Sequence, residues 1–215
     1  MTLATAQQHA VEALRTLIVS GALRPAARVN QEDVAAELGL SVAPVRESLR
    51  VLEQEGQVTY LPRRGYFVTE LNIADLEEIY GLRALLEERA ARHALPVLDD
   101  EALARVREAA RACVTAAEAG DVAAELAANR RFHFGLLDAP GQPHALRVIR
   151  LLWDSTEAYR AMYYNSPEER RASLDAHDAI LAAATARDAD ALVAELHDHR
   201  ERALAVLREI LREPS

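Results

Sequence analysis

The sequence predicts a mainly α-helical protein in two parts: a helix-rich N-terminal region that ends in a β-hairpin, and an all-helical C-terminal antiparallel bundle. Ala, Leu, Glu and Arg dominate the 215 residues and aromatic residues make up only 5%, a composition that favours helices. Apolar residues recur at helical spacing along most of the chain. Strand-like β-branched and aromatic runs occur together at one place, in QVTYL and GYFVT.

The composition excludes several classes of protein. Half of the residues are apolar, which argues for globular domains with real cores rather than a disordered chain. No apolar run approaches the roughly 18 residues of a membrane span, and the first residues lack the features of a secretory signal. The single Cys113 excludes a disulfide framework and a cysteine-rich zinc module. We therefore expect a cytoplasmic protein with no membrane partner.

The charge is distributed unevenly. The formal net charge is −9, from 25 basic and 34 acidic residues, and every basic residue is an arginine. The first 70 residues contain seven of these arginines and eight acids, so their net charge is about −1, and the remaining 145 carry −8. A strongly acidic chain is a poor general binder of nucleic acid. The asymmetry instead suggests two domains, the first of which is free of the acidic excess.

The first region reads as helix, helix, helix, hairpin. Residues 5–20 form the first predicted helix. Asn30 caps the second, QEDVAAEL, which stops at Gly39, and Ser41 caps the third, VAPVRESLRVLEQEG. Two helices joined by so short a turn are typical of a helix-turn-helix, in which the second helix enters the DNA major groove. The hairpin that follows would be its wing, so we place a winged helix-turn-helix DNA-binding domain at residues 1–70.

Arginines occur where such a domain meets DNA. Arg46 and Arg50 lie four residues apart on the third helix, beside Ser41 and Ser48, and Arg63 and Arg64 occupy the hairpin tip. One exposed arginine alone would be read as a solvated surface residue. Four at the recognition helix and wing favour DNA contact. The predicted DNA-binding residues are Asn30, Gln31, Ser41, Arg46, Arg50, Arg63, Arg64 and Gly65.

The second region, residues 71–215, reads as a bundle of six helices. Asn72 caps the first helix and Ser166 with Pro167 begins the fifth. Short connections without strand signals are typical of antiparallel helix packing. The predicted helices are 73–95, 99–118, 121–138, 143–164, 167–186 and 188 to about 212.

Histidines on different predicted helices are candidates for a metal site. Asn129 and His133 are four residues apart and share a helix face, while His177 and His199 lie on two other helices. Helical bundles build metal sites from such inward-pointing side chains. A solvated or packed histidine remains the alternative for each residue taken alone.

The N-terminal residues resemble a known family. LGLSVAPVRESLRVLEQEGQVTYLPRRGYFV is similar to the winged-helix signature of the GntR family of bacterial transcription regulators. The chain departs from the family pattern at Val42 and Ala43, where members usually carry Arg and Thr, and at Pro25-Ala26, where Pro-Gly is usual. The first departure removes an arginine that the resemblance would place on DNA.

The C-terminal residues resemble the helical ligand-binding domain of the FadR-type subfamily, called FCD. The matching features are Arg83-x3-Glu87, Asn129-x3-His133, the segment from His177 and the position of His199. The resemblance implies that Asn129, His133, His177 and His199 hold a divalent metal ion such as zinc, nickel or manganese. A small organic carboxylate would complete its coordination, with effector-binding roles for Arg83, Tyr159 and Tyr163. From spacing alone, Arg83 reads equally well as a surface pair with Glu87, and the tyrosines as core residues.

Together these features predict a ligand-responsive transcription regulator rather than an enzyme. It would bind double-stranded DNA at an inverted-repeat operator as a homodimer held by the helical domain. Two alternatives stay open. The histidines could serve a metal-dependent enzyme, because open coordination positions activate water, or the helical domain could be only a structural platform for dimerisation.

Overall fold

A computed structural model describes residues 3–164 and 166–212 of the chain. The chain divides into two compact units, each described by itself below. The first unit comprises Met1–Leu71 with Trp153–Ala158, and the second comprises Asn72–Leu152 with Tyr159–Ser215.

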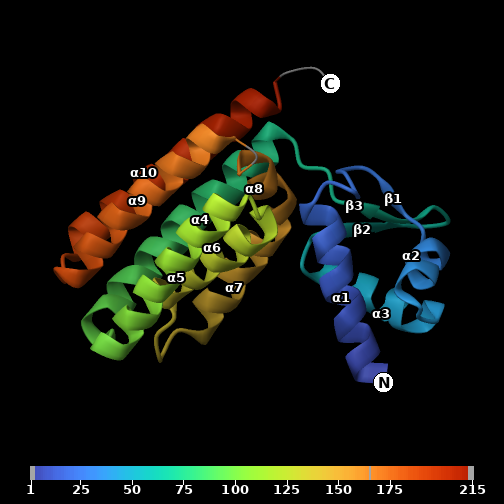
Figure 1. Cartoon of the computed structure of the whole chain (residues 1–215), viewed down its shortest axis with the longest axis horizontal. Coiled ribbons are helices and arrows are strands. Elements are labelled where there is room, and N and C mark those ends of the chain that lie inside the picture. The colour runs from blue at the N-terminus through green and yellow to red at the C-terminus, as the bar shows by residue number, and fades with distance from the viewer. Residues whose placement is uncertain (1–2, 165, 213–215) are drawn as a thin grey trace. The chain divides into compact units, whose positions relative to one another are not determined.

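The first unit contains three helices and a small sheet (Figure 1). Its strands pair antiparallel in the order β1-β3-β2, so that Tyr60 opposes Tyr66 in the hairpin and Val29 pairs with Tyr66 from the other side. The elements are α1 (Leu3–Val19), β1 (Arg28–Val29), α2 (Gln31–Leu38), α3 (Val42–Gln54), β2 (Val58–Leu61) and β3 (Gly65–Val68). The winged helix-turn-helix prediction is confirmed. Strand β1 was not predicted, because two residues are too few to show a period.

Local sequence explains where the helices of the first unit begin and end. The Asn30 side chain accepts a hydrogen bond from the Glu32 N–H and caps α2, and Gly39 ends α2 with a φ of 64°. Ser41 occupies the N-cap position of α3, but its side chain makes no capping hydrogen bond. The core between the helices and the sheet is apolar and includes Leu14, Val34, Val45, Leu49, Leu52 and Val68. This core holds α2 and α3 at their mutual angle.

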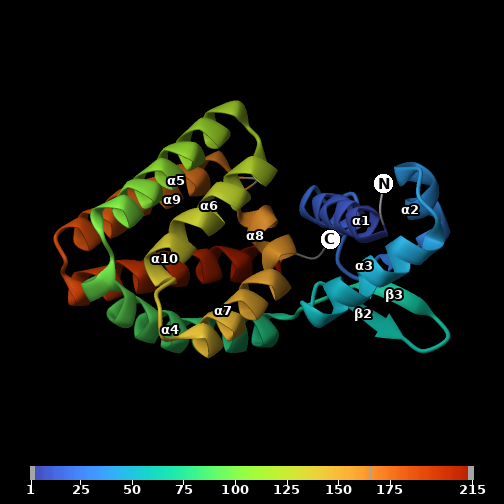
Figure 2. The ribbon, with the colours of Figure 1, turned by 90° about the horizontal axis from the view of Figure 1, so that it is seen from below.

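The second unit is a helical bundle. In both views α9 lies beside α10 and α5 lies beside α6 (Figures 1 and 2). The elements are α4 (Ile73–Ala94), η1 (Leu95–Val97), α5 (Asp100–Ala119), α6 (Val122–Leu137), α7 (Pro143–Ser155), α8 (Glu157–Tyr163), α9 (Pro167–Thr185) and α10 (Ala189–Ile210). Predicted caps are observed: Asn72 forms a capping box with Asp75, and Ser166 and Asp188 cap α9 and α10.

The prediction of one helix over 143–164 is wrong, because the chain breaks into α7 and α8 at Thr156. The Thr156 N–H and hydroxyl both donate to the carbonyl of Trp153, at 3.3 and 3.2 Å. Bonds to a residue three positions back tighten the turn and end the regular ladder.

Within residues 3–164 and 166–212, every helix is too short or too polar to cross a lipid bilayer.

Candidate metal centre and DNA-binding surface

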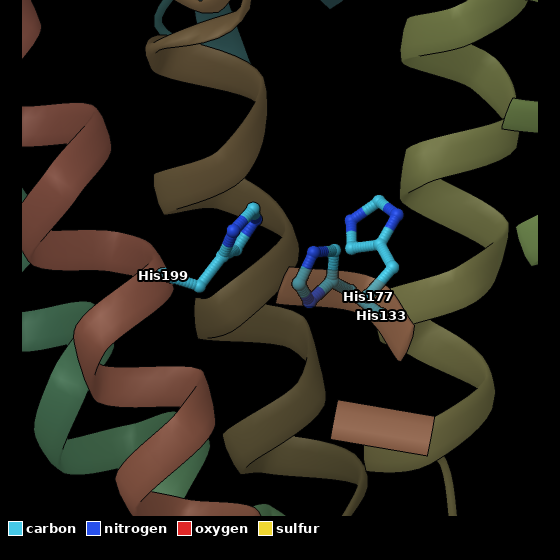
Figure 3. Close-up of side chains that lie close together, drawn as sticks. All are labelled: His133, His177 and His199. Carbon is cyan, nitrogen blue, oxygen red and sulfur yellow. The ribbon is translucent and has the colours of Figure 1, made fainter. Parts of the chain in front are cut away.

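Three histidines from three helices of the second unit converge inside the bundle (Figure 3). His133 lies on α6, His177 on α9 and His199 on α10. Their ring centroids form a near-regular triangle with sides of 5.1, 5.2 and 5.3 Å. One ring nitrogen from each lies within 4.8 Å of the other two. Helical spacing had placed each histidine on a helix, and tertiary packing brings them together.

Burial keeps these imidazoles neutral. Desolvation, reinforced by the neighbouring His199, lowers the pKa of His133 and of His177 well below the ordinary 6.5. Desolvation and the Arg83 guanidinium lower the pKa of His199 to about 4. At neutral pH all three rings therefore carry a lone pair, which is the form that binds a metal ion.

The donor atoms fit a metal ion. Both ring nitrogens of His177, Nδ1 of His199 and Oδ1 of Asn129 are buried and lack a hydrogen-bond partner among the described residues. Leaving such atoms unsatisfied is unfavourable, so they indicate a missing ligand. A metal about 2.1 Å from each nitrogen brings any two of them to within about 4.2 Å, so the rings need to approach by less than about 1 Å. Asn129, 3% exposed, precedes His133 by one turn on the same face of α6.

Arg83 is not part of a surface pair. It is 4% exposed and donates from Nε to Glu87 Oε1 at 2.8 Å, while Arg200 Nη1 on α10 donates to Glu87 Oε2 at 2.9 Å. The surface interpretation of Arg83 is therefore wrong. Its guanidinium also lowers the pKa of His133 and His199, so its charge acts on the histidine cluster. Two buried arginines thus share one carboxylate beside the candidate site.

The tyrosines and Arg160 lie on or next to α8. Tyr159 and Tyr163 are both buried, and the Tyr163 hydroxyl donates to the carbonyl of Glu169 at 3.0 Å. Arg160 between them was not predicted, although it is 5% exposed and its charge lowers the pKa of His133. No signal in the sequence distinguished it, because an arginine on a helix usually keeps its charged end in water.

Glu125 is a second residue that the sequence analysis missed. It is fully buried, neither carboxylate oxygen has a hydrogen-bond partner among the described residues, and its nearest cation is Arg170 Nε at 3.9 Å. Desolvation raises its pKa to about 7. Glu125, Asn129 and His133 follow one another at intervals of four on α6. That spacing could have marked Glu125 as inward-facing.

In the first unit, the arginines of α3 lie on its exposed side. Arg46 Nε donates to Gln31 Oε1 on α2 at 3.4 Å, and Arg50 Nη1 donates to Glu47 at 2.9 Å. Ser41 is exposed at the start of the same helix. Ser48 is not beside them on the surface: it is fully buried, and its hydroxyl donates to the carbonyl of Pro44 at 2.7 Å.

The wing presents a second group of arginines. Arg63 adopts a φ of 65° at the exposed hairpin tip, and the Arg64 guanidinium lies 5.2 Å from the centre of the Phe67 ring. Gly65 follows with a φ of 93°, a conformation that favours glycine. Asn30, in contrast, is occupied in capping α2. Both predicted arginine groups are therefore exposed, one on α3 and the other at the hairpin tip.

Comparisons with known protein families agree with this division. Residues 6–68 match the family described as "Bacterial regulatory proteins, gntR family". Residues 78–202, more than half of the chain, match the FCD domain.

Individual relatives cover nearly the whole chain. It is 29% identical over 198 residues to the Nta operon transcriptional regulator of Aminobacter aminovorans, with 91% of each chain covered. It is 30% identical to the HTH-type transcriptional regulator McbR of Escherichia coli over 78% of this chain and 77% of that one. The solved structure of Escherichia coli McbR/YncC aligns with a TM-score of 0.83 at 26% identity, over 97% of this chain and 98% of that chain. The chain therefore belongs to the GntR family of bacterial transcription regulators, with a GntR-type helix-turn-helix domain followed by an FCD domain.

Proposed function

We propose that this transcription regulator binds an inverted-repeat operator as a homodimer, and that a small organic carboxylate bound at a metal ion in its FCD domain controls that binding. We place the DNA-binding domain at residues 1–70 and the effector-sensing domain at residues 71–215. The observation that carries the proposal is the cluster of His133, His177 and His199, whose nitrogens lie within 4.8 Å of one another.

Asn129, His133, His177 and His199 would hold the ion, with Asn129 supplying an amide oxygen. Zinc, nickel or manganese in such a site keeps open positions that a carboxylate oxygen can occupy. The chain's own residues then select the anion. Arg83 is suited to a carboxylate because a guanidinium presents two parallel N–H donors.

Tyr159 and Tyr163 would line the effector site, together with the buried guanidinium of Arg160. An effector can alter DNA binding only if it binds one arrangement of the helices more tightly than the other. Sensing therefore requires that the effector bind the two arrangements of the helices with different affinities.

The DNA-binding surface is proposed to comprise Asn30, Gln31, Ser41, Arg46, Arg50, Arg63, Arg64 and Gly65. Dimerisation would strengthen weak half-site binding by raising the effective concentration of the second head. Leu82 and Leu85 on α4 and Val148 and Leu151 on α7 are exposed apolar residues of the second unit, and Leu85 is 70% exposed. Such residues favour an association surface on the helical domain. Leu85→Glu should then yield monomers by light scattering, whereas an unchanged dimer would exclude this face.

Metal binding is tested with His177→Ala and a matched control on α10. Exposed His197, two residues from His199, is the control, as His197→Ala. For wild type and His197→Ala, zinc at 100 times Kd should raise stability by about 2.7 kcal/mol and the Tm by about 5–10 °C. His177→Ala should contain no zinc and show no shift. Equal zinc content in the two variants would contradict the site.

A panel of organic acids then separates the functional alternatives. Further stabilisation of the zinc-loaded protein without turnover of the acid supports a sensor. Turnover would support a metal-dependent enzyme. A wild-type protein that binds neither metal nor acid would leave the helical domain as a structural platform.

A further inference from the structure

A groove on the surface of the second unit reaches the histidine cluster. It lies between α5 and α9 and has a volume of about 260 Å³. Its lining residues are Arg107, Ala110, Arg111, Val114, Leu174, His177, Asp178 and Leu181. His177 is only 2% exposed, so it closes the inner end of the groove.

The same imidazole lines both the groove and the cluster. The His177 ring lies 5.3 Å from the ring of His133 and 5.2 Å from that of His199, between centroids. Two larger grooves run along α5 and α6, and none of the three histidines lines either of them. A solute in the α5–α9 groove is therefore one side chain away from the candidate metal.

The lining of the groove carries a formal charge of +1 within an acidic domain. Two arginines and one aspartate line it, while residues 71–215 together carry −8. Arg107 Nη2 donates to Thr185 Oγ1 at 3.4 Å, and Arg111 pairs with exposed Glu108 at 3.2 Å. Such exposed contacts contribute little energy, so both guanidiniums can turn toward an anion. A basic groove with low-dielectric walls concentrates small anions at its inner end.

We propose that small carboxylate anions reach the histidine cluster through the α5–α9 groove, drawn in by Arg107 and Arg111 and passing the side chain of His177. This inference rests on the proposed metal site and adds the route by which its ligand arrives.

The route is tested by filling the groove. Val114 in the groove is 41% exposed, and its control, Val97 in η1, is 62% exposed and lies outside the groove and the proposed association surface. The protein is loaded with zinc, and zinc release is followed after mixing with a dianionic chelator, pyridine-2,6-dicarboxylate, or a neutral one, 1,10-phenanthroline. Val114→Trp should slow release to either chelator about tenfold, because the bundle must then open locally before a chelator enters. Val97→Trp should release zinc at the wild-type rate.

The arginines are tested by charge. The double substitution Arg107→Ala with Arg111→Ala should slow release to the dianion about tenfold and leave release to phenanthroline unchanged, because steering acts only on a charged solute. The difference between the two chelators should shrink as salt is added. Both substitutions lie near the surface, so this variant keeps the test valid if Val114→Trp does not fold.

The outcomes separate the two proposals. Zinc-loaded wild type with equal release rates in Val114→Trp and Val97→Trp would overturn the route and leave the metal site standing. A double arginine variant that slows both chelators equally would overturn the steering role. Wild type without bound zinc would overturn the metal site and the route together.

Discussion

The arginines of the winged helix-turn-helix unit lie outside an apolar core, whereas the bundle encloses arginines, acids and histidines. Among described residues up to 71, the buried polar side chains are those of Ser48 and Gln57, and both are uncharged. Among the described residues of the helical unit, five charged side chains are buried: Arg83, Glu87, Glu125, Arg160 and Arg200. A polar interior is unfavourable for folding, so its presence supports the proposal that the helical unit recognises a small ligand. The first unit instead leaves the arginines of α3 and of the hairpin tip in solvent, where the proposed DNA partner would meet them.

Substituting Glu87 in the helical unit should lower the free energy of unfolding far more than substituting Glu47 in the first unit. Glu87→Gln leaves the buried guanidiniums of Arg83 and Arg200 without their shared carboxylate, which should lower the free energy of unfolding by about 3–5 kcal/mol. Glu47→Gln removes the exposed partner of Arg50 and should change it by less than about 1 kcal/mol. Calorimetry of both variants measures the contrast. A loss at Glu87 as small as that at Glu47 would mean that the buried cluster contributes no more than a surface pair.

Glu125 should make the helical unit sensitive to pH. Its pKa is raised from 4.5 to about 7, so the unfolded state releases this proton first and stability falls as pH rises from about 4.5 to 7. At pH 8 the loss amounts to up to about 3 kcal/mol. Glu125→Gln should therefore stabilise the metal-free protein at pH 8 and change little at pH 4. Denaturant unfolding at both pH values measures this. An equal change in the free energy of unfolding at pH 4 and pH 8 would show that Glu125 ionises normally.

The two arginines of α3 should contact different parts of the DNA, one a base and the other the phosphate backbone. Arg46, which contacts Gln31 and lies near the start of α3, is expected to make a bidentate contact with a guanine, worth about 1–3 kcal/mol of discrimination. Arg50, one turn further on, is expected to contact phosphate. Arg46→Ala should relax the sequence preference found by binding-site selection. Arg50→Ala should weaken every DNA alike and reduce the salt slope by about 1. Identical selected sequences for wild type and Arg46→Ala would remove the specificity role.

The smallest effect is expected at Ala26 in the first unit. Its φ is 65°, a left-handed conformation, at the position where the GntR pattern usually has glycine. Ala26→Gly should stabilise the first unit by up to about 1 kcal/mol, because glycine adopts this conformation without strain. Ala27→Gly, at a neighbour without positive φ, should destabilise by about 0.5–1 kcal/mol. Thermal unfolding of the two variants should therefore shift in opposite directions.

Local signals were sufficient for most of the fold. Asn30, Asn72, Ser166 and Asp188 each accept a backbone N–H at a predicted helix start, because capping depends on residues within one turn. The break at Thr156 was missed, although the polar run from Asp154 to Glu157 interrupts the apolar pattern there and contains residues that favour a helix end or start. Strand β1 was missed for a different reason: two residues become a strand only when β3 pairs with them.

The sequence by itself determined the helical period, the winged hairpin, the family resemblance and the exposed arginines of α3, all of which depend on neighbours along the chain. Only the tertiary structure decided that His133, His177 and His199 meet, that Arg83 is buried with Glu87 and Arg200, and that Arg160 and Glu125 lie inside the bundle. The physical reason is that periodicity shows which face of a helix is buried. It does not show which other helix covers that face, so contacts between distant segments are set by the packing of the whole bundle.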